Sequence, residues 1–182
     1  MSINIKDRKE LTTREVKDVL ELLISVWPPQ NGTPDIENMI KGYKSENQNS
    51  FHKVLLNYNN EELVGHTEIF NRDIIIDSER IQILALAGVC VKLSFRGKNI
   101  GLELVKKSFE FVDSGNFNFS IFQTNMPDFY KKLNCKQINN IFINSKNTDN
   151  VNMNPWRNPY VMIYPDTYEI GNKAIDLNGD CY

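Results

Sequence analysis

The sequence contains little cysteine and little histidine. Its three cysteines, Cys90, Cys135 and Cys181, are an odd number, stand far apart and show no C-x-x-C spacing. A disulfide framework is therefore not expected, and two histidines, His52 and His66, are too few to suggest a zinc site. Reduced thiols of this kind fit a cytoplasmic protein that holds no metal.

Long apolar runs and an excess of basic residues are also missing. The runs at 19–27 and 83–91 fall well short of a membrane span, and the opening residues MSINIKDRKEL contain no apolar core of a signal peptide. The 21 Lys and Arg against 23 Asp and Glu leave a net charge of −2, which is not typical of a general nucleic-acid binder. We expect neither a membrane nor a nucleic acid as partner.

The sequence does contain the pattern of a globular α/β protein. Its 182 residues, 41% of them apolar, are enough for a single domain over 1–182 with a sizeable core. A T-x-x-E capping box predicts a helix over 12–27, and Thr33-Pro34-Asp35 predicts the start of a second helix to about 45. Further helices are expected at about 98–112 and 127–133, and strands at 51–58, 62–70, 80–91, 117–123, 137–143 and 160–164. A hairpin, then a βαβ unit, then more strands indicates an α+β mixed sheet.

A basic turn with two glycines joins the expected strand at 80–91 to the next helix. Apolar alternation stops at Val91, and residues 95–101 read FRGKNIG. A strand, a turn rich in backbone N–H groups and a helix N-terminus together make an anion site, often for phosphate. From these residues alone, an ordinary strand-to-helix turn is the alternative.

Two segments carry a resemblance to a known family. Val89-Cys90-Val91 followed by FRGKNIG resembles the acyl-CoA motif of the GCN5-related N-acetyltransferase (GNAT) superfamily, Arg/Gln-x-x-Gly-x-Gly/Ala after a V-x-V strand. Arg96 and Gly101 match, and Asn99 stands where the middle glycine is expected. Residues 128–135, DFYKKLNC, look like the family's F-Y-x-x-L-G-F segment. The resemblance implies the GNAT fold, a central, mostly antiparallel sheet splayed at the V-x-V strand and flanked by helices.

The resemblance also implies acetyl-CoA as cosubstrate and a site for it. Backbone N–H groups at Val89 and Val91 would polarise the thioester carbonyl and pair with the pantetheine arm. Asn125 is assigned to the same site, and Asn99 is expected to adopt the left-handed conformation that glycine adopts freely. The residues expected to hold the pyrophosphate are Arg96, Gly97, Lys98, Asn99, Ile100, Gly101 and Leu102.

Proton transfer has one candidate acid and several candidate bases. Tyr130 matches the family's general acid, and a phenol suits a thiolate leaving group; packing is the alternative role for this side chain. Glu68, on one strand face with His66, is a candidate base. So are the C-terminal carboxylate of Tyr182 and Asp180, if the tail folds back, and a water chain.

A narrower resemblance concerns the acceptor. Residues 63–74, LVGHTEIFNRDI, and the ending IDLNGDCY look similar to the matching regions of aminoglycoside 2′-N-acetyltransferases. That branch carries a glutamate two residues before the first valine of V-x-V, where this chain has Ala87. The expected activity is transfer of an acetyl group to the amine of a small molecule by direct attack in a ternary complex, with an aminoglycoside-like molecule as one candidate acceptor. A non-catalytic acyl-CoA-binding protein and an enzyme for protein amines are alternatives, and the resemblance admits a homodimer.

Overall fold

The computed structural model describes residues 2–30, 32–45 and 49–182. These residues form two compact units, each built from two stretches of chain. The first unit comprises residues 1–70 and 87–108, and the second comprises 71–86 and 109–182. The long strands β3 (Glu62–Ile76) and β4 (Glu79–Val91) each contribute to both units.

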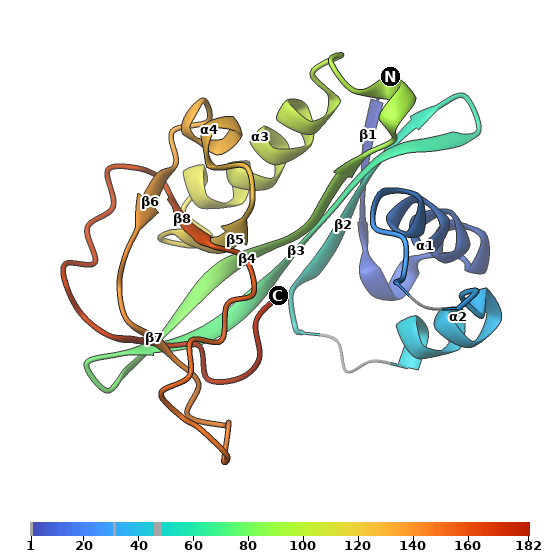
Figure 1. Cartoon of the computed structure of the whole chain (residues 1–182). Helices are drawn as coiled ribbons and strands as arrows, with labels where there is room; N and C mark the ends of the chain where they lie inside the picture. The colour runs from blue at the N-terminus through green and yellow to red at the C-terminus, as the bar shows by residue number, and fades with distance from the viewer. Residues whose placement is uncertain (1, 31, 46–48) are drawn as a thin grey trace. The chain divides into compact units, whose positions relative to one another are not determined.

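The first unit is an antiparallel sheet with helices. Strand β1 (Ser2–Asp7) pairs with β2 (His52–Asn59), and β2 pairs with β3. Helices α1 (Thr13–Val26) and α2 (Ile36–Ser45) lie side by side (Figure 1). The apolar core beneath α1 contains, among others, Val16, Val19, Leu20, Val54, Leu56 and Cys90.

The helix signals of the sequence are confirmed, with later starts for two of the helices. Thr12 caps α1 through the expected capping box, since its hydroxyl accepts from the Glu15 N–H at 3.2 Å and its N–H donates to the Glu15 carboxylate at 2.9 Å. Helix α2 begins later than expected, because Asp35 rather than Thr33 caps it by accepting from the Asn38 N–H at 3.0 Å. Helix α3 (Ile100–Asp113) begins directly after Asn99, two residues later than expected.

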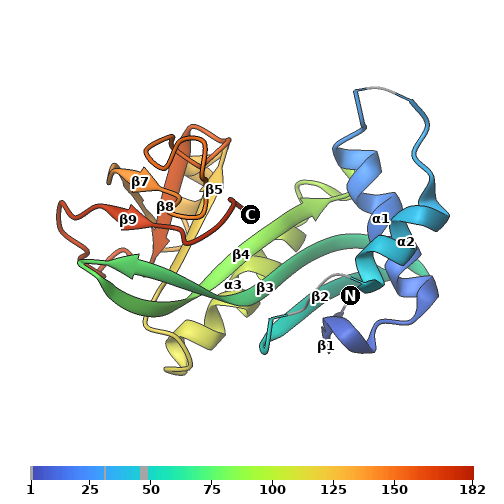
Figure 2. The same ribbon diagram turned by 90° about the horizontal axis from the view of Figure 1, so that it is seen from below.

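The second unit contains the remaining strands. Strand β5 (Ser120–Thr124) is parallel to β4 at Leu84 and Ala85 and antiparallel to β8 (Tyr160–Tyr164), which also pairs with β6 (Lys136–Ile138). The short strands β7 (Phe142–Ile143) and β9 (Ile175–Asp176) pair with each other, and β9 also pairs with the end of β3 (Figure 2). Helix α4 (Pro127–Lys131) follows β5.

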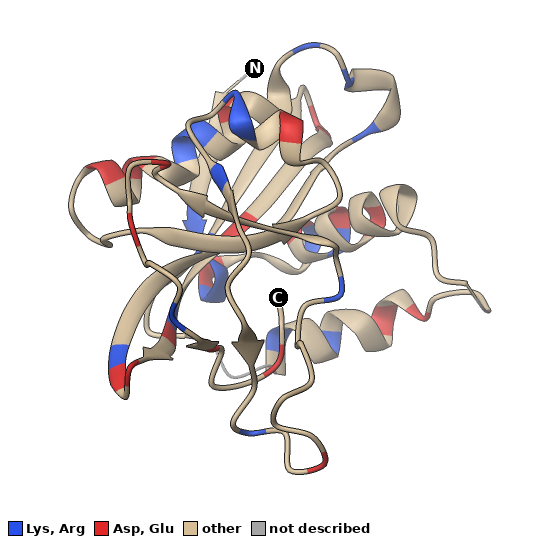
Figure 3. Ribbon diagram, turned by 60° about the vertical axis from the view of Figure 1, so that its left-hand side comes forward, with Lys and Arg blue, Asp and Glu red and all other residues tan. Residues whose placement is uncertain are grey.

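Among the described residues the strands number nine and the α-helices four, and most of the strand pairings are antiparallel, while β4 with β5 and β7 with β9 are parallel. This is the mixed α/β sheet of the GNAT fold, as the sequence predicts. Two strands were not expected, β1 and β9, and the single strand expected at 137–143 is divided into β6 and β7. Lys, Arg, Asp and Glu are interspersed along the helices (Figure 3). None of the described helices is both long and apolar enough to cross a membrane.

Candidate active site

The turn after β4 has the backbone that the sequence predicts. A 3₁₀ turn over Leu93–Phe95 leads into Gly97 and Asn99, which both adopt left-handed conformations, with φ of +75° and +61°. The Asn99 carbonyl accepts from the Glu103 N–H at 3.0 Å, which sets the first turn of α3. The first N–H groups of a helix lack partners within the helix, so this turn presents backbone donors at the positive end of α3.

Side chains hold the turn in place. The Arg96 Nε donates to the Val91 carbonyl at 3.2 Å, and the Lys98 ammonium lies 4.6 Å from the centre of the Phe95 ring. Ile100 is buried, which anchors the start of α3. A Cβ built on Gly97 meets no atom within 4 Å, so this side of the turn is open.

The strand that precedes the turn departs from regular strand geometry at Gly88, which the sequence did not single out. Gly88 has a φ of +61° within β4, directly before Val89. Its carbonyl oxygen lies 2.9 Å from Nδ1 of His66 on β3. A Cβ built on Gly88 would lie 3.0 Å from Cε1 of the same ring. The glycine thus allows both the left-handed backbone and the close approach of the imidazole.

We expect Gly88→Ala to lower the free energy of unfolding by about 2 kcal/mol, since an alanine at positive φ costs roughly 1–2 kcal/mol and its methyl group would also press on His66. Gly97→Ala is the matched control, because its φ is similar and the space beside it is open. Urea unfolding of both variants measures the difference. Equal losses of unfolding free energy in the two variants would show that the His66 ring moves aside without destabilising the protein.

Glu68, with 14% of its side chain exposed, lies at the centre of a largely buried polar cluster in the first unit. Its Oε1 accepts from the Tyr43 hydroxyl at 2.6 Å, and its Oε2 lies 2.7 Å from Nε2 of His52. The Arg8 Nε is 3.8 Å from Oε2, and the His66 Nε2 is 3.4 Å from Oε1. One carboxylate therefore has partners from four elements: the 3₁₀ turn after β1, α2, β2 and its own strand β3.

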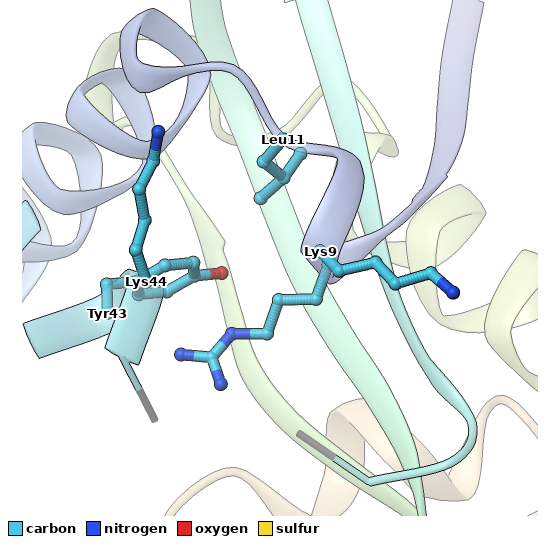
Figure 4. Close-up of a pocket in the computed structure, with 5 residues that line it drawn as sticks. Lys9, Leu11, Tyr43 and Lys44 are labelled. Carbon is cyan, nitrogen blue, oxygen red and sulfur yellow. The ribbon is translucent and has the colours of Figure 1, made fainter. Parts of the chain in front are cut away.

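The cluster also forms the wall of a surface pocket. The Arg8 guanidinium carbon lies 3.9 Å from the centre of the Tyr43 ring. Both residues line a pocket with Lys9, Leu11 and Lys44. Figure 4 shows the Tyr43 hydroxyl directed from α2 toward the segment that carries Lys9 and Leu11.

The charged forms of Glu68 and His66 stabilise each other. Burial raises the pKa of Glu68, but hydrogen bonds from His52 and His66 and the charge of His66 outweigh it and hold that pKa well below its usual range. Burial lowers the pKa of His66, but Cys90 and the Glu68 carboxylate outweigh it and raise the pKa to about 9. At neutral pH the cluster holds an ionised Glu68 and a protonated His66.

Tyr130 belongs to the second unit and lies on α4. Its side chain is buried, and its ring packs against Phe122 at 4.6 Å between centroids and edge-on against Phe129 at 4.9 Å. Burial raises the pKa of its phenol, with a further contribution from Cys135. The hydroxyl is therefore protonated at neutral pH, the form that a general acid requires.

The C-terminal tail is packed rather than frayed. The Tyr182 hydroxyl donates to the Ile121 carbonyl at 2.7 Å, and its terminal oxygen accepts from Gln123 at 2.7 Å. Its ring packs edge-on against Trp156, which is buried in the core of the second unit. The tail therefore folds back on β5 in the second unit.

The structure places the predicted site residues in both units. The first unit holds Glu68, Val89, Val91 and the whole turn from Arg96 to Leu102. The second unit holds Asn125, in the exposed link between β5 and α4, together with Tyr130, Asp180 and Tyr182. Within the first unit Glu68 and His66 lie together, as strand alternation predicts.

Sequence reasoning missed the partners of Glu68. Arg8, Tyr43 and His52 are far from Glu68 in the sequence, and pairing of β2 with β3 brings His52 beside it. The signal available was a pair of ionisable residues, His66 and Glu68, on one face of a strand that is otherwise rich in apolar residues.

A family comparison identifies the class of protein to which this chain belongs. The model of a GNAT acetyltransferase domain matches residues 7–138. The chain therefore belongs to the GNAT acetyltransferase family, whose members take their acyl group from acyl-CoA. No curated protein matches the chain.

Solved structures show the same fold at low identity. Escherichia coli ElaA is 16% identical with a TM-score of 0.60, and the match covers 90% of this chain and 99% of ElaA. A GNAT-family acetyltransferase from Staphylococcus aureus Mu50 is 18% identical with a TM-score of 0.56, covering 89% of this chain and 98% of that one. The chain spans 33% and 34% of two larger matched proteins, from Enterococcus faecalis V583 and Kribbella flavida.

Proposed function

We propose that this protein transfers an acetyl group from acetyl-CoA to the amine of a small molecule. The observation that carries the proposal is the turn between β4 and α3. Its left-handed Gly97 and Asn99 turn the backbone into the N-terminus of α3, and a helix N-terminus of this kind binds phosphate groups.

The turn and the strand before it would bind different parts of acetyl-CoA. Backbone N–H groups from Gly97 to Leu102 would hold the pyrophosphate, with Arg96 and Lys98 adding screened attraction. The pantetheine arm would pair with the strand at Val89 and Val91, and a backbone N–H there would polarise the thioester carbonyl. A preorganised donor of this kind contributes several kcal/mol to the transition state of acyl transfer.

In the chemical step the neutral amine attacks the thioester carbonyl carbon. A C–N bond forms, the C–S bond breaks, and the departing CoA thiolate takes a proton from Tyr130. Water takes the proton that the amine releases, and a proton returned from water restores the phenol. Direct transfer in a ternary complex needs no covalent enzyme intermediate.

Glu68 is a weak candidate for the base in this step. Its lowered pKa means that it binds a proton poorly, and both of its oxygens already have partners. The terminal oxygen of Tyr182 accepts from Gln123, and Asp180 accepts from Asn144 at 3.3 Å. We therefore assign removal of the proton from the amine to water. Glu68 instead balances the positive charges of Arg8 and His66 in the first unit.

Calorimetric titration with acetyl-CoA tests the proposal. We expect binding that weakens with dephospho-CoA and is lost with adenosine. Asn99→Gly should bind at least as tightly as the natural protein, because glycine adopts positive φ without strain. Asn99→Val should bind more weakly, since a β-branched residue at this φ is strained.

Asn60→Val is the control, because Asn60 has a φ of +56° in the β2–β3 turn and is not among the residues proposed to hold the pyrophosphate. It should share the stability loss of Asn99→Val and keep acetyl-CoA binding. No binding of acetyl-CoA at millimolar concentration would reject the proposal. If binding is found, a screen of amine acceptors follows, with aminoglycosides first and peptides as the comparison.

A further inference from the structure

We propose that His66 is a positioning residue for acyl transfer: its ring, held between the Gly88 carbonyl and the Glu68 carboxylate, fixes the peptide unit whose other end is the Val89 N–H. The inference rests on the proposed function, in which a backbone N–H at this strand polarises the thioester.

The covalent geometry links His66 to that donor. The carbonyl of Gly88 and the N–H of Val89 belong to one planar peptide unit, so a group that fixes the oxygen also fixes the direction of the N–H. Nδ1 of His66 lies 2.9 Å from the Gly88 oxygen. Gly88 has a positive φ of +61° within β4, so the backbone here departs from regular strand geometry, and the His66 contact fixes the carbonyl at this point.

The orientation of the imidazole is itself determined. The ring is 1% exposed, and the backbone of Gly88 lies close against it, since a Cβ built on Gly88 would be 3.0 Å from its Cε1 and 3.3 Å from its Nδ1. Its Nε2 is 3.4 Å from Glu68 Oε1, and that carboxylate is fixed in turn by Tyr43 from α2 and His52 from β2. The ring therefore has a single arrangement in which one nitrogen faces the Gly88 oxygen and the other faces Glu68.

Charge adds to this geometry. The ionisable groups around His66 are Glu68 on its own strand, Cys90 on β4, and His52, Tyr43 and Arg8 through Glu68. With its pKa raised to about 9, the imidazole is cationic at neutral pH. A cationic donor makes a stronger hydrogen bond than a neutral one, and a peptide polarised at its oxygen donates more strongly from its N–H.

The neighbouring peptide offers a matched control. The Thr67 hydroxyl donates to the Ala87 carbonyl at 3.0 Å. This contact also joins a buried β3 side chain to a β4 carbonyl, but that peptide ends at the Gly88 N–H rather than the Val89 N–H. Thr67→Val removes the contact with little change of shape.

The test follows the Val89 amide by NMR in the protein without ligands. We expect its ¹H and ¹⁵N shifts to titrate together with the His66 ring, with a common midpoint near pH 9, in the natural protein and in Thr67→Val. The titration should vanish in His66→Asn, which keeps a neutral donor near the Nδ1 position, and in His66→Leu, which keeps none. Thermal unfolding confirms that each variant is folded.

Kinetics then separate positioning from a purely structural role. We expect kcat to fall about 10-fold in His66→Asn and further in His66→Leu, while KM for acetyl-CoA changes less than 2-fold. This is part of the roughly 10²–10³-fold effect of losing a whole oxyanion donor. In the natural protein kcat should fall as the pH rises through about 9, because His66 then loses its charge, and His66→Asn should lack this fall.

The outcomes distinguish the two proposals. A Val89 amide that does not respond to His66, or a kcat in His66→Leu equal to that in Thr67→Val, overturns the positioning role. If no amine is acetylated by the natural protein, the proposed function fails. The coupling of the Val89 amide to His66 is still decided by the NMR titration.

Discussion

Replacing Glu68 with alanine is expected to lower the free energy of unfolding by about 3–5 kcal/mol, the usual cost of removing one partner from a buried ionic cluster. The change leaves the Tyr43 hydroxyl and the His52 ring without their acceptor, and it removes the negative charge beside His66 and Arg8. Urea unfolding at pH 7, followed by far-UV circular dichroism, measures the loss.

Glu61→Ala is the control for this variant. It removes the same charge from a side chain that is 89% exposed and lies 3.4 Å from Arg14, and exposed pairs contribute little. Its stability should stay close to that of the natural protein. A loss for Glu68→Ala below about 1 kcal/mol would mean that water readily replaces the carboxylate, and the cluster would then be open to solvent.

Tyr130→Phe should reduce kcat by about 10²-fold or more, the scale expected for loss of a general acid. Acetyl-CoA affinity should stay unchanged, because the substitution keeps the ring that packs on Phe122 and Phe129. Steady-state kinetics and calorimetry on the same preparation give the two quantities. The matched control is Tyr160→Phe, at the more exposed start of β8.

The result also separates the alternative functions. A variant that keeps the full rate would leave Tyr130 a packing residue and give the proton to another donor. A natural protein that binds acetyl-CoA yet acetylates neither small amines nor peptides would be an acyl-CoA-binding protein, the alternative from another functional class.

The elements that the sequence predicts are those with local signals. The capping box of α1 and the left-handed Asn99 depend on residues close together in the chain, and both are observed. Strand β1 lacks such a signal, because it forms through pairing with β2, from Ser2 opposite Tyr58 to Asp7 opposite Lys53. Strand β9 has two residues and exists through its pairing with β3 and β7.

The candidate site likewise contains features that local sequence predicts and features that only long-range contacts create. The turn after β4 was identified because its glycines, its basic residues and the helix start are contiguous. Arg8, Tyr43 and His52, which contact Glu68, come from three separate elements, so only tertiary structure reveals that its carboxylate is largely buried and that both of its oxygens have partners. Gly88 is one of nine glycines, and nothing in the residues around it shows that an imidazole from another strand packs against it.

The discontinuous make-up of the two units bears on how the chain can be made and divided. Residues 87–108 complete the first unit, yet they leave the ribosome only after residues 71–86, which belong to the second. The first unit therefore cannot finish folding from a nascent chain that ends at residue 86. Until residues 87–108 are synthesised, its sheet lacks the segment of β4 that belongs to it. No single cut in the polypeptide chain releases either unit whole, so fragments expressed alone should be prone to aggregation. A split-protein reporter made from this chain would be cut within a loop, and both fragments would be needed to rebuild either unit.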